Sequence, residues 1–210
     1  MLSTRTRIAA LGSLGQIYAR PSPLSARFFS RLSIPDPQSL PKSTQQTIQA
    51  HHNDNWVRAF ALNPDTLRRF VTHYEDLFSD QTTKLQADDR ELIAVVVSGF
   101  NGCGLCRSNH TLGLAAALGN DNAARLRAKN IALDWHTAGG LSERQKTLAS
   151  FAELLASRPR EAGKKELEEL KQVGFAEDEI VEILEVVGWF SYSNRLVIAL
   201  GIEPDDRYFQ

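Results

Sequence analysis

Apolar residues recur at three- and four-residue spacing along most of the chain beyond residue 43, which is the period of one face of an α-helix. A clear example is the face formed by Leu67, Phe70, Val71, Tyr74 and Leu77. Alternating runs of β-branched residues are scarce, and no Asn-Gly pair is flanked by candidate strands. The pattern therefore predicts an all-α fold.

The expected helix boundaries follow from this periodicity together with capping residues. We predict helices over residues 44–62, 63–77, 87–101, 103–119, 122–129, 143–157, 161–173 and 177–200. Asn63 with Pro64 opens the second of these, and Ser142 with Gln145 forms a capping box before the sixth. Residues 92–97 are all apolar, so we expect the third helix to be central.

The predicted core draws on both ends of this helical region. Its candidates include Trp56, Phe60 and Leu62 from the first helix, and Ile180, Ile183, Leu184, Val187, Phe190, Leu196 and Leu200 from the last. Tryptophan more often packs in a core than contacts a cofactor, so Trp56, Trp135 and Trp189 are interpreted as core residues. Asn194 and Arg195 are interpreted as structural residues of the last helix.

The overall composition excludes several classes of partner. The formal net charge is −1, which gives no basis for nucleic-acid binding. The longest apolar run, residues 92–97, is far shorter than the roughly 20 residues of a membrane span. We therefore expect neither a nucleic-acid partner nor a membrane.

The first part of the chain differs from the rest. Residues 1–35 contain five arginines and no aspartate or glutamate, and five of the eight prolines lie before residue 43. This composition is typical of a mitochondrial transit peptide, and Arg27-Phe-Phe-Ser30 is similar to a matrix-processing site. We predict a transit peptide and linker over residues 1–43, a helical domain over 44–203 and a C-terminal tail over 204–210. A mitochondrial matrix location is expected, with a plain tail and a cytoplasmic location as the alternative.

The chain has two cysteines, Cys103 and Cys106, and His110 follows one helical turn after the second. At the start of a helix, this spacing brings two Cα atoms to about 5–6 Å, which a disulfide tolerates. The helix N-terminus stabilises a thiolate, and a histidine on the same face can serve Cys106 as a general base. Glu91, on the preceding predicted helix, can orient that histidine. The four residues predict thiol–disulfide or peroxide chemistry.

The cysteines and their neighbours suggest four other interpretations. Covalent haem attachment is excluded, because Arg107 stands where a CxxCH motif has its histidine. A thioredoxin fold is disfavoured, because this CxxC lies among helices. A zinc site with both cysteines, His110 and Glu91 as ligands stays open, as does a structural role as small buried residues beside a capping histidine.

The segment from Glu91 to His110 resembles the signature of the AhpD-like alkylhydroperoxidases, within the carboxymuconolactone decarboxylase-like superfamily. Their pattern is Glu, eleven residues, Cys, two residues, Cys, three residues and His, and all four positions match. The peroxidase-related branch of the family is also similar at Asn63-Pro-Asp, at Leu141-Ser-Glu-Arg and at Gly174-Phe-Ala-Glu-Asp-Glu-Ile. The resemblance covers about residues 44–203.

The resemblance implies an all-helical homo-oligomer that reduces hydroperoxides. It implies that Cys106 is the peroxidatic cysteine, which passes through a sulfenic acid, and that Cys103 is the resolving partner and proton donor. Glu91 and His110 would form the proton relay that activates Cys106. No resident cofactor or metal is expected, and regeneration would need a reducing protein, an external dithiol or a lipoyl-type reductant.

One position departs from the family pattern. The best-studied members carry a histidine one residue before the second cysteine, where this chain has Leu105. The relay would then depend on His110 alone. The alternative function is a non-enzymatic oligomer of the same fold that senses redox state, binds metal or serves assembly. A decarboxylase or lactone-processing role is disfavoured, because that chemistry needs no thiol pair.

Overall fold

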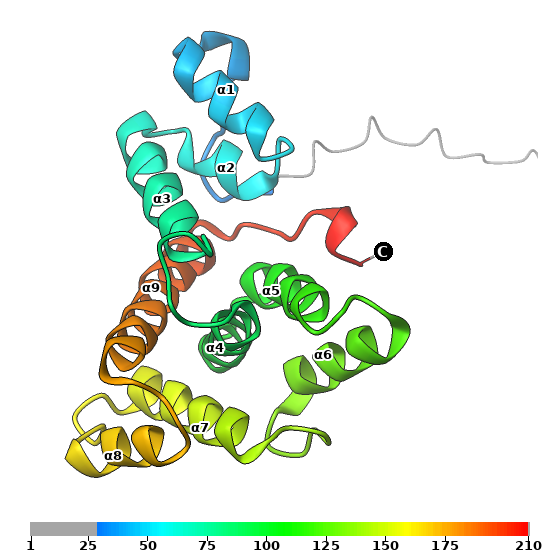
Figure 1. The fold of residues 1–210 in the computed structure, drawn as a ribbon. Helices are drawn as coiled ribbons and strands as arrows, with labels where there is room; N and C mark the ends of the chain where they lie inside the picture. Colours follow the sequence, from blue (N-terminus) through cyan, green and yellow to red (C-terminus); the bar gives the residue numbers. More distant parts are fainter. Residues whose placement is uncertain (1–28, 210) are drawn as a thin grey trace, which may run out of the picture.

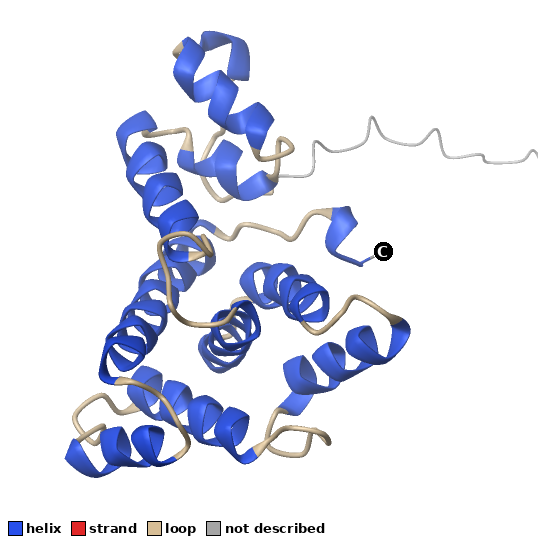
Figure 2. Cartoon of the chain, viewed as in Figure 1, coloured by secondary structure: helices blue, strands red, loops and turns tan. Residues whose placement is uncertain are grey.

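The computed structural model describes residues 29–209, and all regular structure in that range is helical (Figure 2). The prediction of an all-α fold is therefore confirmed. Residues 1–28, which include most of the predicted leader, lie outside the described range, so the transit peptide remains a prediction.

The described range contains nine α-helices and two short 3-10 helices. Their bounds are η1 (Pro37–Ser39), α1 (Lys42–Ala50), α2 (Asn55–Phe60), α3 (Pro64–Leu77), α4 (Ala87–Asn101), α5 (Gly104–Ala117), α6 (Asn122–Asp134), α7 (Glu143–Ser157), α8 (Lys164–Gln172), α9 (Glu177–Leu200) and η2 (Asp206–Phe209).

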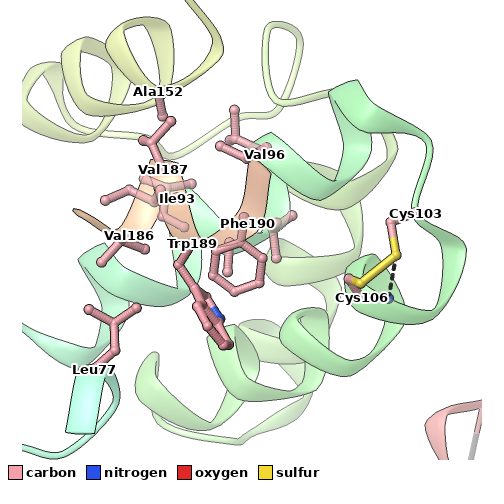
Figure 3. Packing of buried hydrophobic residues seen from close by; sticks show 14 of the residues in the cluster. Leu77, Ile93, Val96, Cys103, Cys106, Ala152, Val186, Val187, Trp189 and Phe190 are labelled. Carbon is pink, nitrogen blue, oxygen red and sulfur yellow. Dashed lines mark hydrogen bonds between the residues drawn. A yellow bond between two sulfur atoms is a disulfide. The ribbon is translucent and has the colours of Figure 1, made fainter. Parts of the chain in front are cut away.

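Helix α4 lies in the middle of the molecule, and α5, α6, α7 and α9 pack around it (Figure 1). All residues from Leu92 to Ser98 are buried, which confirms the prediction that this helix is central. Side chains of α9 meet those of α4 in the core, as Val187 and Phe190 do beside Ile93 and Val96 (Figure 3). Helix α9 could span a membrane by length and composition, but its buried face packs into this core.

Several predicted helix ends are confirmed. The Asn63 side chain accepts a hydrogen bond from the Thr66 amide at 3.0 Å and caps α3. Ser142 and Gln145 form the predicted capping box of α7. Gly102 ends α4 in the left-handed conformation (φ 74°), which a residue without Cβ adopts at little cost. The turn to the cysteines is therefore set by local sequence.

Other predicted boundaries were wrong. Residues 44–62 form two helices instead of one, because His52 and Asn53 adopt positive φ and break the chain between α1 and α2. Leu62 and Leu184, which were predicted in the core, are 42% and 38% exposed. Helix α6 continues five residues beyond its predicted end at residue 129, to Asp134, and α8 begins at Lys164 instead of residue 161.

The two ends of the described chain are fastened to the helical body. The Arg31 amide and guanidinium donate to the last carbonyls of α9. Near the other end, the Tyr208 hydroxyl donates to buried Asp54 at 2.6 Å, and Arg207 pairs with the same carboxylate. Asp54 immediately precedes α2, so the C-terminal segment fixes the start of that helix.

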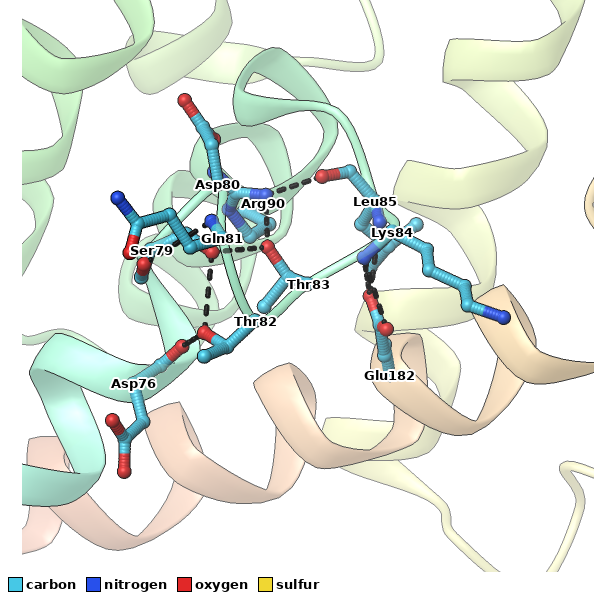
Figure 4. A network of polar contacts seen from close by, with 10 residues as sticks. All are labelled: Asp76, Ser79, Asp80, Gln81, Thr82, Thr83, Lys84, Leu85, Arg90 and Glu182. Carbon is cyan, nitrogen blue, oxygen red and sulfur yellow. Dashed lines mark hydrogen bonds and ion pairs between the residues drawn. The ribbon is translucent and has the colours of Figure 1, made fainter.

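A buried arginine organises the loop between α3 and α4 (Figure 4). The Arg90 guanidinium is almost fully buried and donates to the Leu85 carbonyl, the Thr83 hydroxyl and Asp80. Glu182 of α9 accepts from the backbone amides of Lys84 and Leu85. These bonds hold the loop that leads into the helix carrying Glu91.

A second buried charge joins α4 to α7. Asp89 is fully buried, and one guanidinium nitrogen of Arg144 donates to both of its carboxylate oxygens at 2.7 Å. Burial raises the pKa of Asp89, and the Arg144 hydrogen bond opposes that rise. The ion pair therefore keeps a carboxylate charged where the surrounding apolar core disfavours charge.

Replacing Arg144 with methionine should destabilise the fold by about 3 kcal/mol at neutral pH, because a buried carboxylate loses its partner. Without the arginine the pKa of Asp89 rises further above its unfolded value, so the folded state binds the proton more tightly than the unfolded chain. The penalty should therefore shrink as the pH falls from 7.5 to 5. Urea unfolding of the wild type and the variant at pH 7.5 and pH 5 measures this loss of stability. Equal losses at the two pH values would contradict the assignment of Asp89 as a buried carboxylate that Arg144 keeps charged.

The matched control is Arg158→Met, which breaks an exposed ion pair with Glu161. Exposed pairs contribute little, so this change should alter stability by less than about 0.5 kcal/mol at either pH.

Candidate functional site

The cysteine pair occupies the junction of α4 and α5. Cys103 is the N-cap of α5, and its Sγ accepts a hydrogen bond from the Cys106 amide at 3.4 Å (Figure 3). The two cysteines are joined by a disulfide with their Cα atoms 5.4 Å apart, within the range expected from the spacing. The structure therefore represents the oxidised form of a CxxC pair at a helix N-terminus.

Glu91 and His110 meet between the same two helices. Glu91 Oε2 lies 2.7 Å from His110 Nδ1, and the side chains are 15% and 6% exposed. Because the carboxylate binds Nδ1, the Nε2 side of the imidazole is left for other chemistry. His110 is four residues after Cys106, one turn along the same helix face. The structure brings together all four predicted site residues; their catalytic roles remain predictions.

A glycine makes room for the carboxylate. Gly113 follows His110 by one turn on α5, and a Cβ at this position would overlap the Glu91 carboxylate. The carboxylate thus lies directly against the backbone of α5. Any larger residue at position 113 would have to displace it, so Gly113 contributes to the Glu91–His110 geometry without a side chain of its own.

Aromatic rings enclose the imidazole of His110. Ring centroids of Phe190, Phe78 and Tyr74 lie 4.7, 5.2 and 6.2 Å from that of His110. Burial, followed by the nearby charge of Glu91, raises the pKa of the Tyr74 hydroxyl. Tyr74 is therefore protonated at neutral pH and remains able to donate a hydrogen bond.

A small cavity of about 50 Å³ opens beside this pair. It is lined by Trp56, Phe70, Tyr74, Leu105, Cys106, Asn109, His110, Trp189, Phe190, Ser193 and Val197. Cys106 is in this lining and Cys103 is not, so of the two cysteines Cys106 is the one beside the cavity. Its role as the residue that meets a ligand remains a prediction.

Sequence reasoning missed most of this cavity. Trp56 and Trp189 are buried as predicted, but they also form its walls. Asn109 and Ser193 were not singled out at all. A serine within the apolar stretch of the last helix was an available signal for Ser193, and Asn109 precedes His110 in the motif.

Asn194 and Arg195 do not line the cavity. Asn194 is fully buried and donates to Ser98 Oγ at 3.2 Å, while its Oδ1 accepts from Asn101 at 2.9 Å. Arg195 is exposed and bonds the Ser191 carbonyl of its own helix. The interpretation of both as structural residues agrees with these contacts, and Asn194 fastens α9 to the end of α4 beside the cysteines.

In this structure the four residues of the zinc alternative are bonded to one another in two pairs. Across residues 29–209, no group of three or more His, Cys, Asp or Glu side chains is arranged to hold a metal ion. Both cysteine sulfurs are bonded to each other, and His110 Nδ1 is bonded to Glu91.

A model of the Carboxymuconolactone decarboxylase family matches residues 64–125, the region that contains Glu91, both cysteines and His110. No curated protein matches the chain. Among solved structures, an uncharacterized peroxidase-related protein with an alkylhydroperoxidase AhpD core, from Ralstonia eutropha JMP134, is similar with a TM-score of 0.78 and 26% identity. That alignment covers 86% of this chain and 95% of the other.

Two further structures extend the comparison. An uncharacterized peroxidase-related protein from Silicibacter sp. TM1040 has a TM-score of 0.76 and 28% identity, over 85% of this chain and 93% of its own. The debrominase Bmp8 has a TM-score of 0.67 and 16% identity, over 84% of this chain and 92% of its own. At that identity the debrominase shows a shared fold alone.

Proposed function

Because this chain is an AhpD-like member of the carboxymuconolactone decarboxylase-like superfamily, we propose that it is a thiol-dependent peroxidase that reduces hydroperoxides through Cys106 and Cys103. The observation that carries the proposal is the placement of Cys106 in a cavity beside a Glu91–His110 pair, with Cys103 within disulfide distance behind it.

The proposed cycle starts from the reduced pair. His110 accepts the Cys106 thiol proton, and Glu91 stabilises the resulting imidazolium. The thiolate attacks the terminal oxygen of the hydroperoxide; an S–O bond forms, the O–O bond breaks, and the leaving oxygen takes the electron pair and the proton. The products are a Cys106 sulfenic acid and an alcohol.

In the second half of the cycle the disulfide forms and is then reduced. The Cys103 thiol attacks the sulfenic sulfur, which releases water and forms the Cys103–Cys106 bond. An external dithiol, such as a lipoyl-type reductant or a reducing protein, then donates two electrons and two protons by thiol–disulfide exchange. The disulfide seen in the structure corresponds to the species that such a reductant would reduce.

The cavity favours an organic hydroperoxide over hydrogen peroxide. Its walls are formed largely by Trp56, Phe70, Trp189 and Phe190, which accept an apolar substituent. Leu105 also lines it, so the position that carries histidine in the best-studied relatives adds apolar surface here. We expect proton transfer to depend on His110 and the apolar lining to select the substrate.

The test measures oxidation of Cys103 and Cys106 by a hydroperoxide together with formation of the alcohol. Reduced full-length protein is mixed with one equivalent of cumene hydroperoxide, and free thiols and cumyl alcohol are quantified; loss of two thiols per alcohol formed is expected. With excess dithiothreitol the alcohol should then accumulate catalytically. Protein with both cysteines alkylated is the control. Thiols that stay free after peroxide would reject the peroxidase.

We propose a mitochondrial matrix location and assembly into a homo-oligomer for the active protein. The acid-free, arginine-containing segment of residues 1–35 supports the location. Deleting residues 1–29 should shift a fluorescent fusion from mitochondria to the cytosol. An unchanged distribution would disprove the leader.

A further inference from the structure

Ser193 of α9 carries a buried hydroxyl that the protein leaves unpaired. The residue is 3% exposed, and its Oγ has no hydrogen-bond partner in the described structure. Buried polar groups are almost always paired, and a serine inside a helix can bond the carbonyl four residues before it. The Ser193 hydroxyl makes no such bond, so it does not stabilise the fold through a hydrogen bond.

The neighbouring residue shows that buried polar side chains in this turn of α9 are not generally left unpaired. Asn194 is also buried, but both ends of its amide are bonded, to Ser98 and to Asn101. Packing at this point of α9 is therefore compatible with full pairing. Ser193 differs because it lines the cavity, whereas Asn194 bonds side chains of α4.

The cavity gives the hydroxyl a function. Ser193 lines it together with Cys106 and His110, so α5 contributes the cysteine and the histidine to the lining and α9 contributes the serine. The rest of the lining is mostly apolar or aromatic. A bound molecule with one polar oxygen and an apolar body fits this arrangement.

We propose that Ser193 is a hydrogen-bond donor of this cavity, in addition to Tyr74, and holds the leaving oxygen of the substrate hydroperoxide. In an in-line displacement the sulfur, the attacked oxygen and the leaving oxygen are roughly collinear, so the leaving oxygen points away from Cys106. As the S–O bond forms and the O–O bond breaks, negative charge collects on that oxygen. A donor already in place stabilises it, and the proton from His110 then completes the alcohol.

This inference rests on the proposed peroxidase, and it predicts an unusual pair of effects for Ser193→Ala. The rate constant for oxidation of reduced Cys106 by cumene hydroperoxide should fall roughly ten- to hundredfold, because a donor to developing charge is lost. The urea midpoint should stay unchanged or rise, because the variant removes an unpaired buried hydroxyl. A structural serine would give the opposite stability result.

The matched control is Ser191→Ala. Ser191 lies two residues before Ser193 in α9 and outside the cavity lining, so this change should alter neither the rate constant nor the urea midpoint. If Ser193→Ala is oxidised as fast as the wild type, the inference is wrong and the peroxidase stands. If the variant is slowed and destabilised together, the hydroxyl is structural and the inference is again wrong.

A second measurement does not need turnover. Trp56 and Trp189 line the cavity, so binding of the product analogue cumyl alcohol can be followed by tryptophan fluorescence. We expect a tenfold weaker affinity in Ser193→Ala than in the wild type. If the wild type fails to consume peroxide but this difference is present, the peroxidase falls and the donor role of Ser193 survives. Equal affinities, or no binding to either protein, would overturn the donor role.

Discussion

Cys106→Ser protein should consume no organic hydroperoxide above the background rate of the dithiol, whereas reduced Cys103→Ser protein without added dithiol should complete one oxidation and then stop. The reason is the different position of the two cysteines, since Cys106 lines the cavity and Cys103 does not. Without Cys103 no disulfide can form, so the sulfenic acid on Cys106 should persist and react with dimedone. Mass spectrometry of the trapped adduct gives the readout.

The two variants control for each other, because they remove the same functional group three residues apart in the same helix turn. The adduct should appear in Cys103→Ser and be absent from Cys106→Ser. The reverse distribution would show that Cys103 meets the peroxide and that the assignment of the two sulfurs must be exchanged.

Glu91→Gln should slow the oxidation of Cys106 by about a hundredfold while leaving the urea midpoint nearly unchanged. Glutamine fills the same space beside His110 but cannot stabilise an imidazolium as a carboxylate does, and general acid–base catalysis contributes factors of about 10² to 10⁴. Stopped-flow measurement of the single-turnover rate from pH 6 to 9 gives the test. An exposed carboxylate, as in Glu168→Gln, provides the control.

Gly113→Ala tests the Glu91–His110 contact without removing any polar group. Its new Cβ overlaps the Glu91 carboxylate, so the carboxylate must shift relative to His110 Nδ1, and the rate should fall by about tenfold. Gly188→Ala is a matched control, because this glycine also lies within a helix and nothing lies within 4 Å of its missing Cβ. A Gly113→Ala protein as fast as the wild type would show that the Glu91–His110 contact is dispensable.

The residues closest to the chemistry were predictable because they are linked by local geometry. Cys103, Cys106 and His110 belong to one helix, and Gly102 sets the turn before it, so spacing alone fixes their relation. Glu91 required one assumption, that α4 packs beside α5, and the turn between them makes the packing almost unavoidable. The 2.7 Å contact with His110 bears out that assumption.

The cavity could not be predicted in this way. Trp56 and Ser193 belong to helices that are far apart in the sequence, and periodicity says which face of a helix is buried but not what it is buried against. An apolar residue that lines a cavity has the same pattern as one that fills a core. The break after α1 was missed for a local reason: His52 and Asn53 adopt positive φ, and only the asparagine hints at it.

The contact of the C-terminal segment with Asp54 has a consequence for the cavity. Asp54 is 3% exposed and starts α2, the helix that supplies Trp56, and its partners Arg207 and Tyr208 lie 153 and 154 residues later in the chain. The tryptophan wall is therefore anchored by a segment outside the helices that carry the cysteines. Loss of these two partners would leave a buried carboxylate unpaired at the start of α2 and would loosen that wall.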